Sequence, residues 1–165
     1  MSAAPHRVRA FIGVGANLGF SRDAVLNALL DLERLPDSEF IAASSLYRST
    51  PVDAEGPDFI NAVAEIETGM SAIDLLHALL AIEKSHGRVR TTRNAPRTLD
   101  LDLLLHGDTV SNTAELTLPH ARLTERAFVL MPLLEIDPGL QIPGAGPASA
   151  LFEAVEDQDI ERLEP

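Results

Sequence analysis

The chain has 165 residues, no cysteine and a formal net charge of −12 at pH 7. This length suits one domain with a sizeable core. The lack of cysteine excludes disulfides and thiolate metal sites, and the acidic balance disfavours a nucleic-acid duplex as ligand. Residues 1–9 lack the long apolar stretch of a signal peptide, and no run approaches the roughly 20 apolar residues that cross a bilayer. We therefore expect a cytoplasmic monomer with no nucleic-acid or membrane partner.

The first part of the chain predicts strands and one helix. Residues 8–15 have the β-branched and aromatic content of a buried strand that enters the glycine loop GANLGF. A helix follows over residues 21–35 and ends at Pro36. Two further strands, separated by the loop STPVDAEGPD, are predicted at residues 39–48 and 59–68.

A second helix and one more strand complete the pattern. Ser71 begins a helix over residues 72–86, and Gly87 stops it. After an arginine-rich loop, residues 96–107 (PRTLDLDLLLHG) predict a strand. The order strand, helix, strand, strand, helix, strand is typical of a ferredoxin-like α+β sandwich (βαββαβ), with both helices on one face of the sheet. The other face is then left for a ligand.

The rest of the chain adds short helices and strands to the same domain, residues 1–165. Residues 119–138 predict short helical pieces broken by Pro132, which could wall one side of a site. We expect residues 1–7 to form an N-terminal tail and residues 150–165 a peripheral C-terminal segment.

Two aspartates share one face of the last predicted strand. Because side chains alternate across a strand, the expected core face carries Leu99, Leu101, Leu103 and Leu105, and the opposite face carries Asp100, Asp102 and Leu104. Residues two apart on one face lie roughly 6.5 Å apart at Cα. Two carboxylates at that spacing can share hard cations such as magnesium. The alternative is an edge strand with solvated aspartates.

A cluster of arginines lies just before the aspartates. Lys84 is the single lysine, whereas four of the twelve arginines fall within residues 88–97. They are Arg88, Arg90, Arg93 and Arg97. Guanidinium groups bind phosphate or carboxylate in a planar, two-pronged geometry. Magnesium together with a polyphosphate satisfies both the acidic and the basic set, although a solvated basic loop is the simpler alternative.

Motifs along residues 12–138 together resemble the 6-hydroxymethyl-7,8-dihydropterin pyrophosphokinase family. They are GANLG (15–19), YRSTPV (47–52), PDFINAV (57–63), IEKSHGRVR (82–90), PRTLDLD (96–102), LTLPH (116–120) and ERAFVLMPL (125–133). The resemblance implies a ferredoxin-like fold. It also implies transfer of pyrophosphate from ATP to the pterin hydroxymethyl group in folate biosynthesis, giving AMP and using two magnesium ions. The whole chain would be one pyrophosphokinase domain.

The same resemblance assigns roles to individual residues. Asp100 and Asp102 match the magnesium ligands, and with Arg88 and Arg97 they form the expected catalytic set. The residues expected around ATP are Glu83, Arg88, Arg90, Arg93, Arg97, Thr117, His120 and Arg126. Those expected around the pterin are Gly15, Ser49, Thr50, Val52, Phe59, Asn61 and Phe128. Among them, Phe59 and Phe128 match aromatics that sandwich the ring, and Asn61 matches the amide that reads its polar edge.

One departure and two rival functions remain open. Asn94 and Ala95 stand where many relatives carry Trp-Gly before the Pro-Arg of the basic loop. A nucleotidyl transferase could also hold two magnesium ions on acidic strand residues, and its product would be pyrophosphate rather than AMP. A ferredoxin-like ligand sensor could use the same pocket without turnover of ATP.

Overall fold

The computed structural model describes residues 7–16, 21–49, 59–86 and 99–163. Up to residue 106, the elements in chain order are β1 (Val8–Ala16), α1 (Ser21–Leu32), β2 (Ser38–Ala43), β3 (Tyr47–Ser49), β4 (Phe59–Thr68), α2 (Ala72–Ser85) and β5 (Asp100–His106). After residue 106 follow β6 (Ser111–Asn112), β7 (Thr117–Leu118), the 3-10 helix η1 (Leu123–Glu125), α3 (Ala127–Ile136), β8 (Gln141–Ile142), β9 (Gly146–Pro147), α4 (Ala148–Glu153) and β10 (Ile160–Arg162).

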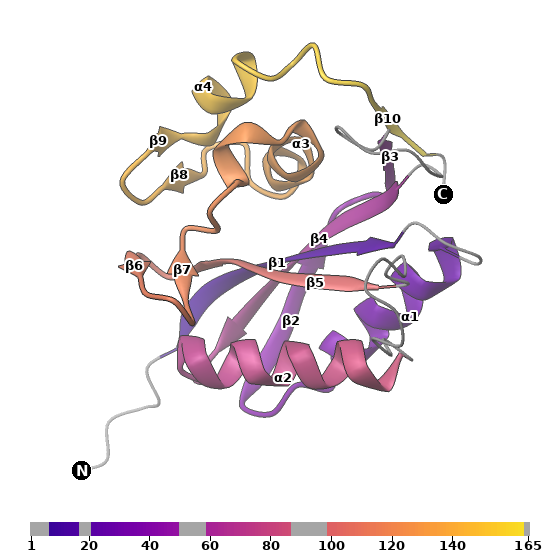
Figure 1. Cartoon of the computed structure of the whole chain (residues 1–165), viewed down its shortest axis with the longest axis vertical. Helices are drawn as coiled ribbons and strands as arrows, with labels where there is room; N and C mark the ends of the chain where they lie inside the picture. The colour runs from indigo at the N-terminus through magenta and orange to yellow at the C-terminus, as the bar shows by residue number, and fades with distance from the viewer. Residues whose placement is uncertain (1–6, 17–20, 50–58, 87–98, 164–165) are drawn as a thin grey trace.

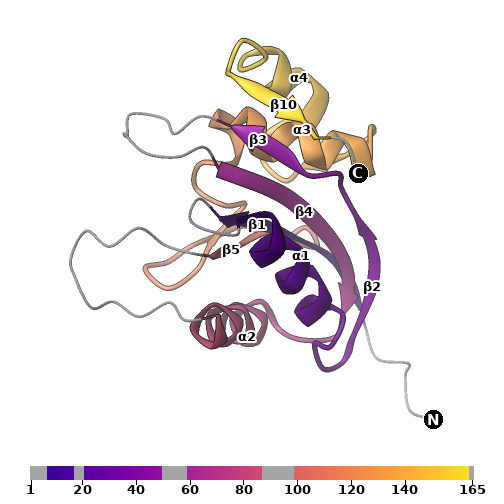
Figure 2. The same ribbon diagram turned by 90° about the vertical axis from the view of Figure 1, so that its right-hand side faces the viewer.

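An antiparallel sheet runs through the middle of the molecule. Its strands follow the order β10-β3-β4-β1-β5, and β2 also pairs with β4. Helices α1 and α2 lie on one side of this sheet, and α3 and α4 lie on the other (Figures 1 and 2). With β2 and β3 counted as one interrupted strand, the order is that of the βαββαβ sandwich. The predicted ferredoxin-like fold is confirmed.

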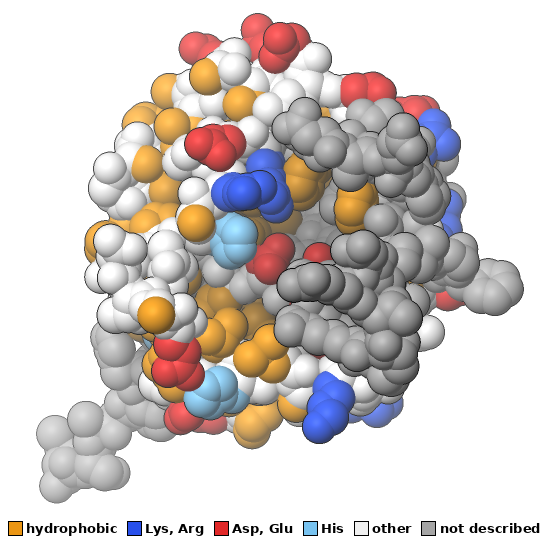
Figure 3. Space-filling model, viewed as in Figure 1, with side chains coloured by type: hydrophobic (Ala, Val, Ile, Leu, Met, Phe, Trp, Pro, Cys, Tyr) orange, Lys and Arg blue, Asp and Glu red, His pale blue; other side chains and the backbone are white. Residues whose placement is uncertain are grey.

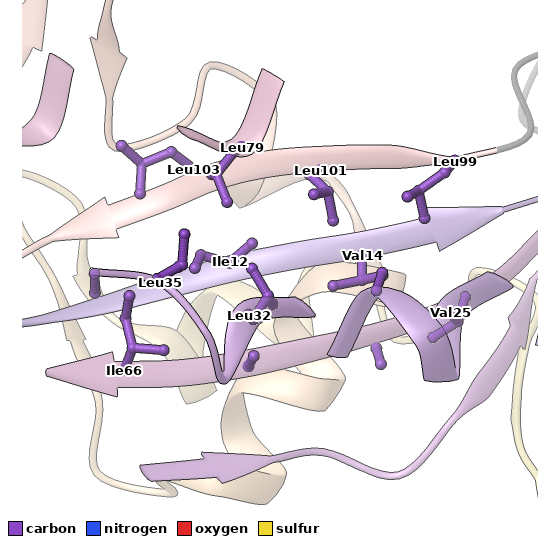
Figure 4. Close-up of a cluster of buried hydrophobic side chains, with 14 of the residues drawn as sticks. Ile12, Val14, Val25, Leu32, Leu35, Ile66, Leu79, Leu99, Leu101 and Leu103 are labelled. Carbon is purple, nitrogen blue, oxygen red and sulfur yellow. The ribbon is translucent and has the colours of Figure 1, made fainter. Parts of the chain in front are cut away.

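The larger core lies between the sheet and the first two helices. Val25 and Leu32 of α1 and Leu79 of α2 are fully buried in it, against side chains of β1, β4 and β5 (Figure 4). Helix α2 begins as predicted, because Ser71 Oγ accepts a hydrogen bond from the Asp74 amide at 3.1 Å. Helix α1 is shorter than predicted. Its end tightens into i→i−3 turns before Leu35, which is still buried.

The predicted strand at residues 39–48 is two strands. At Ser44, the amide donates to the Val63 carbonyl at 2.8 Å, but the Val63 amide donates to the Ser44 hydroxyl at 2.9 Å. A side-chain acceptor thus replaces the backbone acceptor of the ladder, and the strand stops there. The chain then begins β3 on the same partner strand, β4.

The prediction that Leu105 shares the face of the other strand leucines is wrong. Ile12 pairs with Leu103 and Phe11 pairs with Leu105, so β5 contains one extra residue at this point. Such a bulge reverses the alternation. Leu104 and Leu105 therefore both enter a second core, which is covered by α3 and α4. The sheet face expected to be left for ligand is consequently filled over part of its area.

The predicted break at Pro132 is also wrong. Helix α3 runs through Pro132, which itself is buried. Proline removes one helix hydrogen bond, but Leu130 and Leu133 on the same helix are completely buried in the second core, and this burial holds the helix together. Further along, β10 forms the edge of the main sheet by pairing with β3. Across the part of the chain that the structure describes, every helix is too short or too polar to cross a lipid bilayer.

Candidate active site

Two cavities adjoin at β5, one beside α3 and the other beside α2, and the aspartates of β5 line both. The first, here called the aromatic cavity, has a volume of about 490 Å³ and includes Phe59, Asn61 and Phe128 in its wall. The second, the α2 cavity, has a volume of about 420 Å³ and includes Glu83 and His120. The space-filling view shows the face hollowed near its centre, with acidic, histidine and basic side chains around the hollow (Figure 3). Asp100 and Asp102 belong to the walls of both cavities.

The aspartates reach this position because glycines lie opposite them. Across the β1–β5 pairing, Gly15 lies opposite Asp100 and Gly13 lies opposite Asp102. Glycine leaves the face beside each carboxylate open, where a larger side chain would crowd it. Leu101 on the same strand is buried on the other face. The alternation expected for the two aspartates therefore holds on this part of β5.

Asn61 is held in the wall of the aromatic cavity. Only 5% of it is exposed, and its Nδ2 donates to Ser49 Oγ at 2.8 Å. Gly15 is its cross-strand partner on β1, and a Cβ placed on that glycine would lie 3.0 Å from Asn61 Oδ1. This hydrogen bond uses one of the two donor hydrogens of the amide. The contact with Ser49 and the closeness of Gly15 fix the orientation of the group.

Two phenylalanines approach the same cavity from different elements. Phe59 begins β4, and Phe128 lies in the first turn of α3. Both are partly exposed where they line the cavity. The guanidinium of Arg126 lies over the Phe128 ring, 5.2 Å from its centre. Arg126 was expected near the nucleotide, and the structure places it in the wall of the aromatic cavity.

The α2 cavity is anchored by a buried carboxylate. Glu83 is 3% exposed, and its Oε2 accepts a hydrogen bond from the Leu101 amide of β5 at 2.7 Å. His120 Nε2 lies 3.7 Å from Asp102 Oδ1, and the exposed Thr117 lies further along the same wall. The bond from Glu83 fixes α2 to the strand that carries both aspartates.

Several expected site residues lie outside the described residues. They are Thr50, Val52, Arg88, Arg90, Arg93 and Arg97, and the Asn94-Ala95 pair lies there as well. The described chain stops at His86 and resumes at Leu99, directly before Asp100. Of the expected pterin set, the structure brings together Gly15, Ser49, Phe59, Asn61 and Phe128.

Some residues around the cavities were not predicted from the sequence. Arg122, Glu125 and Gln158 line the aromatic cavity. Arg122 and Gln158 lie outside every motif named above, and Glu125 begins the motif ERAFVLMPL but was assigned no role. The packing of η1 and of the turn that follows Val155 on the second core places these side chains in the wall.

A further carboxylate ties α3 to the strands beside it. Glu135 accepts hydrogen bonds from the Tyr47 hydroxyl and from the Ser45 amide, the latter at 2.9 Å. Burial alone would raise the pKa of Glu135, but these hydrogen bonds outweigh it and hold that pKa below its usual value. Burial and the bond to Glu135 raise the pKa of Tyr47.

The donor set of the site suits magnesium. Within the described ranges, no group of three or more His, Asp or Glu side chains could hold a metal ion unaided. Magnesium is commonly bound by one or two carboxylates, with water and substrate phosphates completing its shell. Asp100 and Asp102 are carboxylates on one strand face, and the Asp102 side chain is 44% exposed. The residues present therefore fit a magnesium site that is completed by a phosphate ligand.

Comparison with known proteins places the chain in a family. The profile of the 7,8-dihydro-6-hydroxymethylpterin-pyrophosphokinase (HPPK) family matches residues 11–138. A 2-amino-4-hydroxy-6-hydroxymethyldihydropteridine pyrophosphokinase of Pseudomonas aeruginosa is 42% identical over 156 residues, which is 94% of this chain and 96% of that protein. The protein of the same name from Haemophilus influenzae is 37% identical, over 96% of this chain and 99% of its own length.

Solved structures agree on the fold. A crystal structure of Plasmodium falciparum HPPK-DHPS superimposes with a TM-score of 0.74 at 14% identity. The match covers 93% of this chain and 46% of that longer chain. At this identity the likeness concerns the fold. The family profile and the two bacterial relatives show that the chain belongs to the 7,8-dihydro-6-hydroxymethylpterin-pyrophosphokinase family, whose named members are pyrophosphokinases.

Proposed function

We propose that the protein transfers pyrophosphate from ATP to 6-hydroxymethyl-7,8-dihydropterin, giving AMP and the pterin diphosphate, with two magnesium ions. The observation that carries the proposal is the position of Asp100 and Asp102, which line both adjoining cavities. A transfer reaction needs its two substrates to meet at the group that neutralises the transferred charge. The aspartates occupy that position between the cavities.

The chemistry of the aromatic cavity favours the pterin. Its volume of about 490 Å³ lies in the range of small-molecule sites. Phe59 and Phe128 offer flat apolar surfaces to a fused ring, and the amide of Asn61 offers its remaining donor hydrogen and its acceptor oxygen to the polar edge of that ring. A buried amide of fixed orientation discriminates between ligands, because a mismatched edge would leave polar groups unpaired.

The α2 cavity is the proposed site of ATP. Thr117 and His120 offer hydrogen-bonding groups in its wall, and Asp100 and Asp102 lie at its boundary with the aromatic cavity. We assign the four arginines at residues 88–97 to the phosphates, because guanidinium groups neutralise the charge that develops during phosphoryl transfer. Glu83 has a positioning role, since it binds the backbone of β5 directly between the two aspartates.

The proposed reaction is an in-line displacement. The hydroxyl oxygen of the pterin bonds to the β-phosphorus of ATP, the bond from that phosphorus to the α–β bridging oxygen breaks, and AMP leaves. The hydroxyl proton is lost to solvent. Bound magnesium would neutralise the polyphosphate charge and polarise its oxygens. Asp100 and Asp102 would hold the ions, while the cavity walls hold the two substrates in line.

Product identification tests this function against its rivals. The protein is incubated with ATP, magnesium chloride and the pterin alcohol, and the products are separated by anion-exchange chromatography. We expect equal amounts of AMP and pterin diphosphate. Free pyrophosphate together with a nucleotidylated pterin would instead indicate a nucleotidyl transferase, and no consumption of ATP would indicate a ligand sensor.

We also propose that residues 1–165 act as one monomeric pyrophosphokinase domain in the cytoplasm. The absence of cysteine supports a reducing compartment. Size-exclusion chromatography with light scattering would check the monomer, and a dimer mass at micromolar protein would contradict it.

A further inference from the structure

The C-terminal segment at residues 155–162 touches both walls of the aromatic cavity. On one side, Ile160 of β10 pairs with Ser49 of β3, the residue whose hydroxyl accepts from Asn61. On the other side, Gln158 contacts the junction between η1 and α3. The match to the family profile ends at residue 138, so this segment lies beyond it.

The amide of Gln158 makes two hydrogen bonds that bracket Arg126. Its Oε1 accepts from the Ala127 amide at 2.9 Å, and its Nε2 donates to the Glu125 carbonyl at 2.9 Å. Helix α3 has no side-chain cap from its own N-cap residue, Arg126. Gln158, 31 residues away along the chain, therefore accepts a hydrogen bond from the first amide of α3.

Gln158 is itself well supported. Its own amide donates to the Val155 carbonyl at 3.0 Å, and Val155 is buried in the second core. Ile160, two residues further on, packs against the same core. The side chain thus projects from a turn that is fixed on both sides, and it also lines the aromatic cavity.

We propose that Gln158 is a positioning residue that sets the place of the Arg126–Phe128 wall relative to the Asn61 wall. Both hydrogen bonds act on the backbone next to Arg126, whose guanidinium lies over the Phe128 ring. An amide is required because one contact needs an acceptor and the other a donor. With pterin as the ligand, which rests on the proposed function, Gln158 governs affinity for the pterin and not for ATP.

The test compares Gln158→Ala and Gln158→Glu with the matched control Asp157→Ala. Asp157 is exposed on the same turn and does not line either cavity. For each purified protein, KM is measured separately for the pterin alcohol and for ATP. Hydrogen exchange of the Ala127 amide is measured by NMR without ligands, and thermal unfolding checks that each variant is folded.

We expect Gln158→Ala to raise the KM for the pterin about tenfold, since small misplacements of a binding group are costly. The KM for ATP should stay within about twofold, because the α2 cavity is untouched. Gln158→Glu keeps the acceptor for the Ala127 amide but loses the donor, so it should fall between Gln158→Ala and the wild type. The Ala127 amide should exchange faster in Gln158→Ala only, and Asp157→Ala should match the wild type throughout.

Two results would overturn the inference. One is an unchanged KM for the pterin in Gln158→Ala with unchanged exchange at Ala127. The other is an equal rise in both KM values, which would show a general structural effect. If the wild type does not turn over the pterin, the proposed function fails, while the exchange at Ala127 still reports whether Gln158 holds the junction.

Discussion

Substitution of Gly15 by alanine adds a single methyl group to the wall of the aromatic cavity beside Asn61. The new Cβ would lie 3.0 Å from Asn61 Oδ1, so that oxygen must move by a few tenths of an ångström to reach ordinary contact. Asn61 is nearly buried and bonded to Ser49. The movement must therefore turn the amide or lengthen that bond. Overpacking of this kind costs about 1 kcal/mol at the lower end of its usual range.

The loss should appear in ligand binding more than in stability. Alanine also lowers the conformational entropy of the unfolded chain, which offsets about 0.4–1 kcal/mol. The melting temperature should therefore change by no more than about 3 °C. A turned amide, in contrast, leaves polar edges of the pterin unpaired, so we expect about tenfold weaker pterin binding, or about 1.4 kcal/mol.

Calorimetry with the pterin alcohol, in the presence of magnesium and a nonhydrolysable ATP analogue, measures this effect. Gly13→Ala is the matched control for stability, because its Cβ would meet Leu104 at 3.4 Å, an ordinary contact. That variant should melt at the wild-type temperature or up to about 3 °C above it, because the gain from the unfolded chain is then not offset by overpacking. Wild-type affinity for the pterin in Gly15→Ala would refute the placement of the Asn61 amide against the ligand.

Three further predictions concern the carboxylates. Asp100→Asn and Asp102→Asn should each keep the fold, since both side chains are partly exposed, but should lose about 10³-fold in magnesium-dependent turnover; near-normal rates at saturating magnesium would remove the metal site. Glu83→Ala should lower the free energy of unfolding in urea by about 1–3 kcal/mol, because it leaves the buried Leu101 amide without this acceptor. Glu83→Gln should recover part of that loss. Equal stability of both variants and the wild type would contradict the role of Glu83 as the acceptor for Leu101. The pKa of Glu135 is lowered in the folded protein. Its ionised form therefore contributes to the free energy of unfolding above its unfolded pKa, and this contribution is lost as the pH falls through its folded pKa. The difference in unfolding free energy between the wild type and Glu135→Gln should shrink between pH 6 and pH 3, and a constant difference would contradict this role.

Local patterns predicted the elements that hold the aspartates. Alternation along β5 correctly predicted that Asp100 and Asp102 share one face. The pairing of β5 with β1 is regular over residues 100–103, which contain both aspartates. The same reasoning failed at Leu105, because a bulge depends on how two strands pair and not on either strand alone. Periodicity in one segment carries no information about that pairing.

Packing between distant segments accounts for the other differences. Pro132 is a helix breaker by local rules, and only the second core shows why α3 continues through it. Gln158 contacts Ala127 across 31 residues of sequence. Neither a motif nor a hydrophobic period could associate a single polar side chain with a cavity so far away along the chain.

The path of the β-phosphate tests the central claim most directly. The protein is incubated with magnesium, the pterin alcohol and ATP that carries an isotopic label in the β-phosphate, and the label is followed through the separated products. We predict that all transferred label appears in the pterin diphosphate and that the AMP carries none. Label retained in ADP, or released as free pyrophosphate, would contradict the transfer of a pyrophosphate group at Asp100 and Asp102.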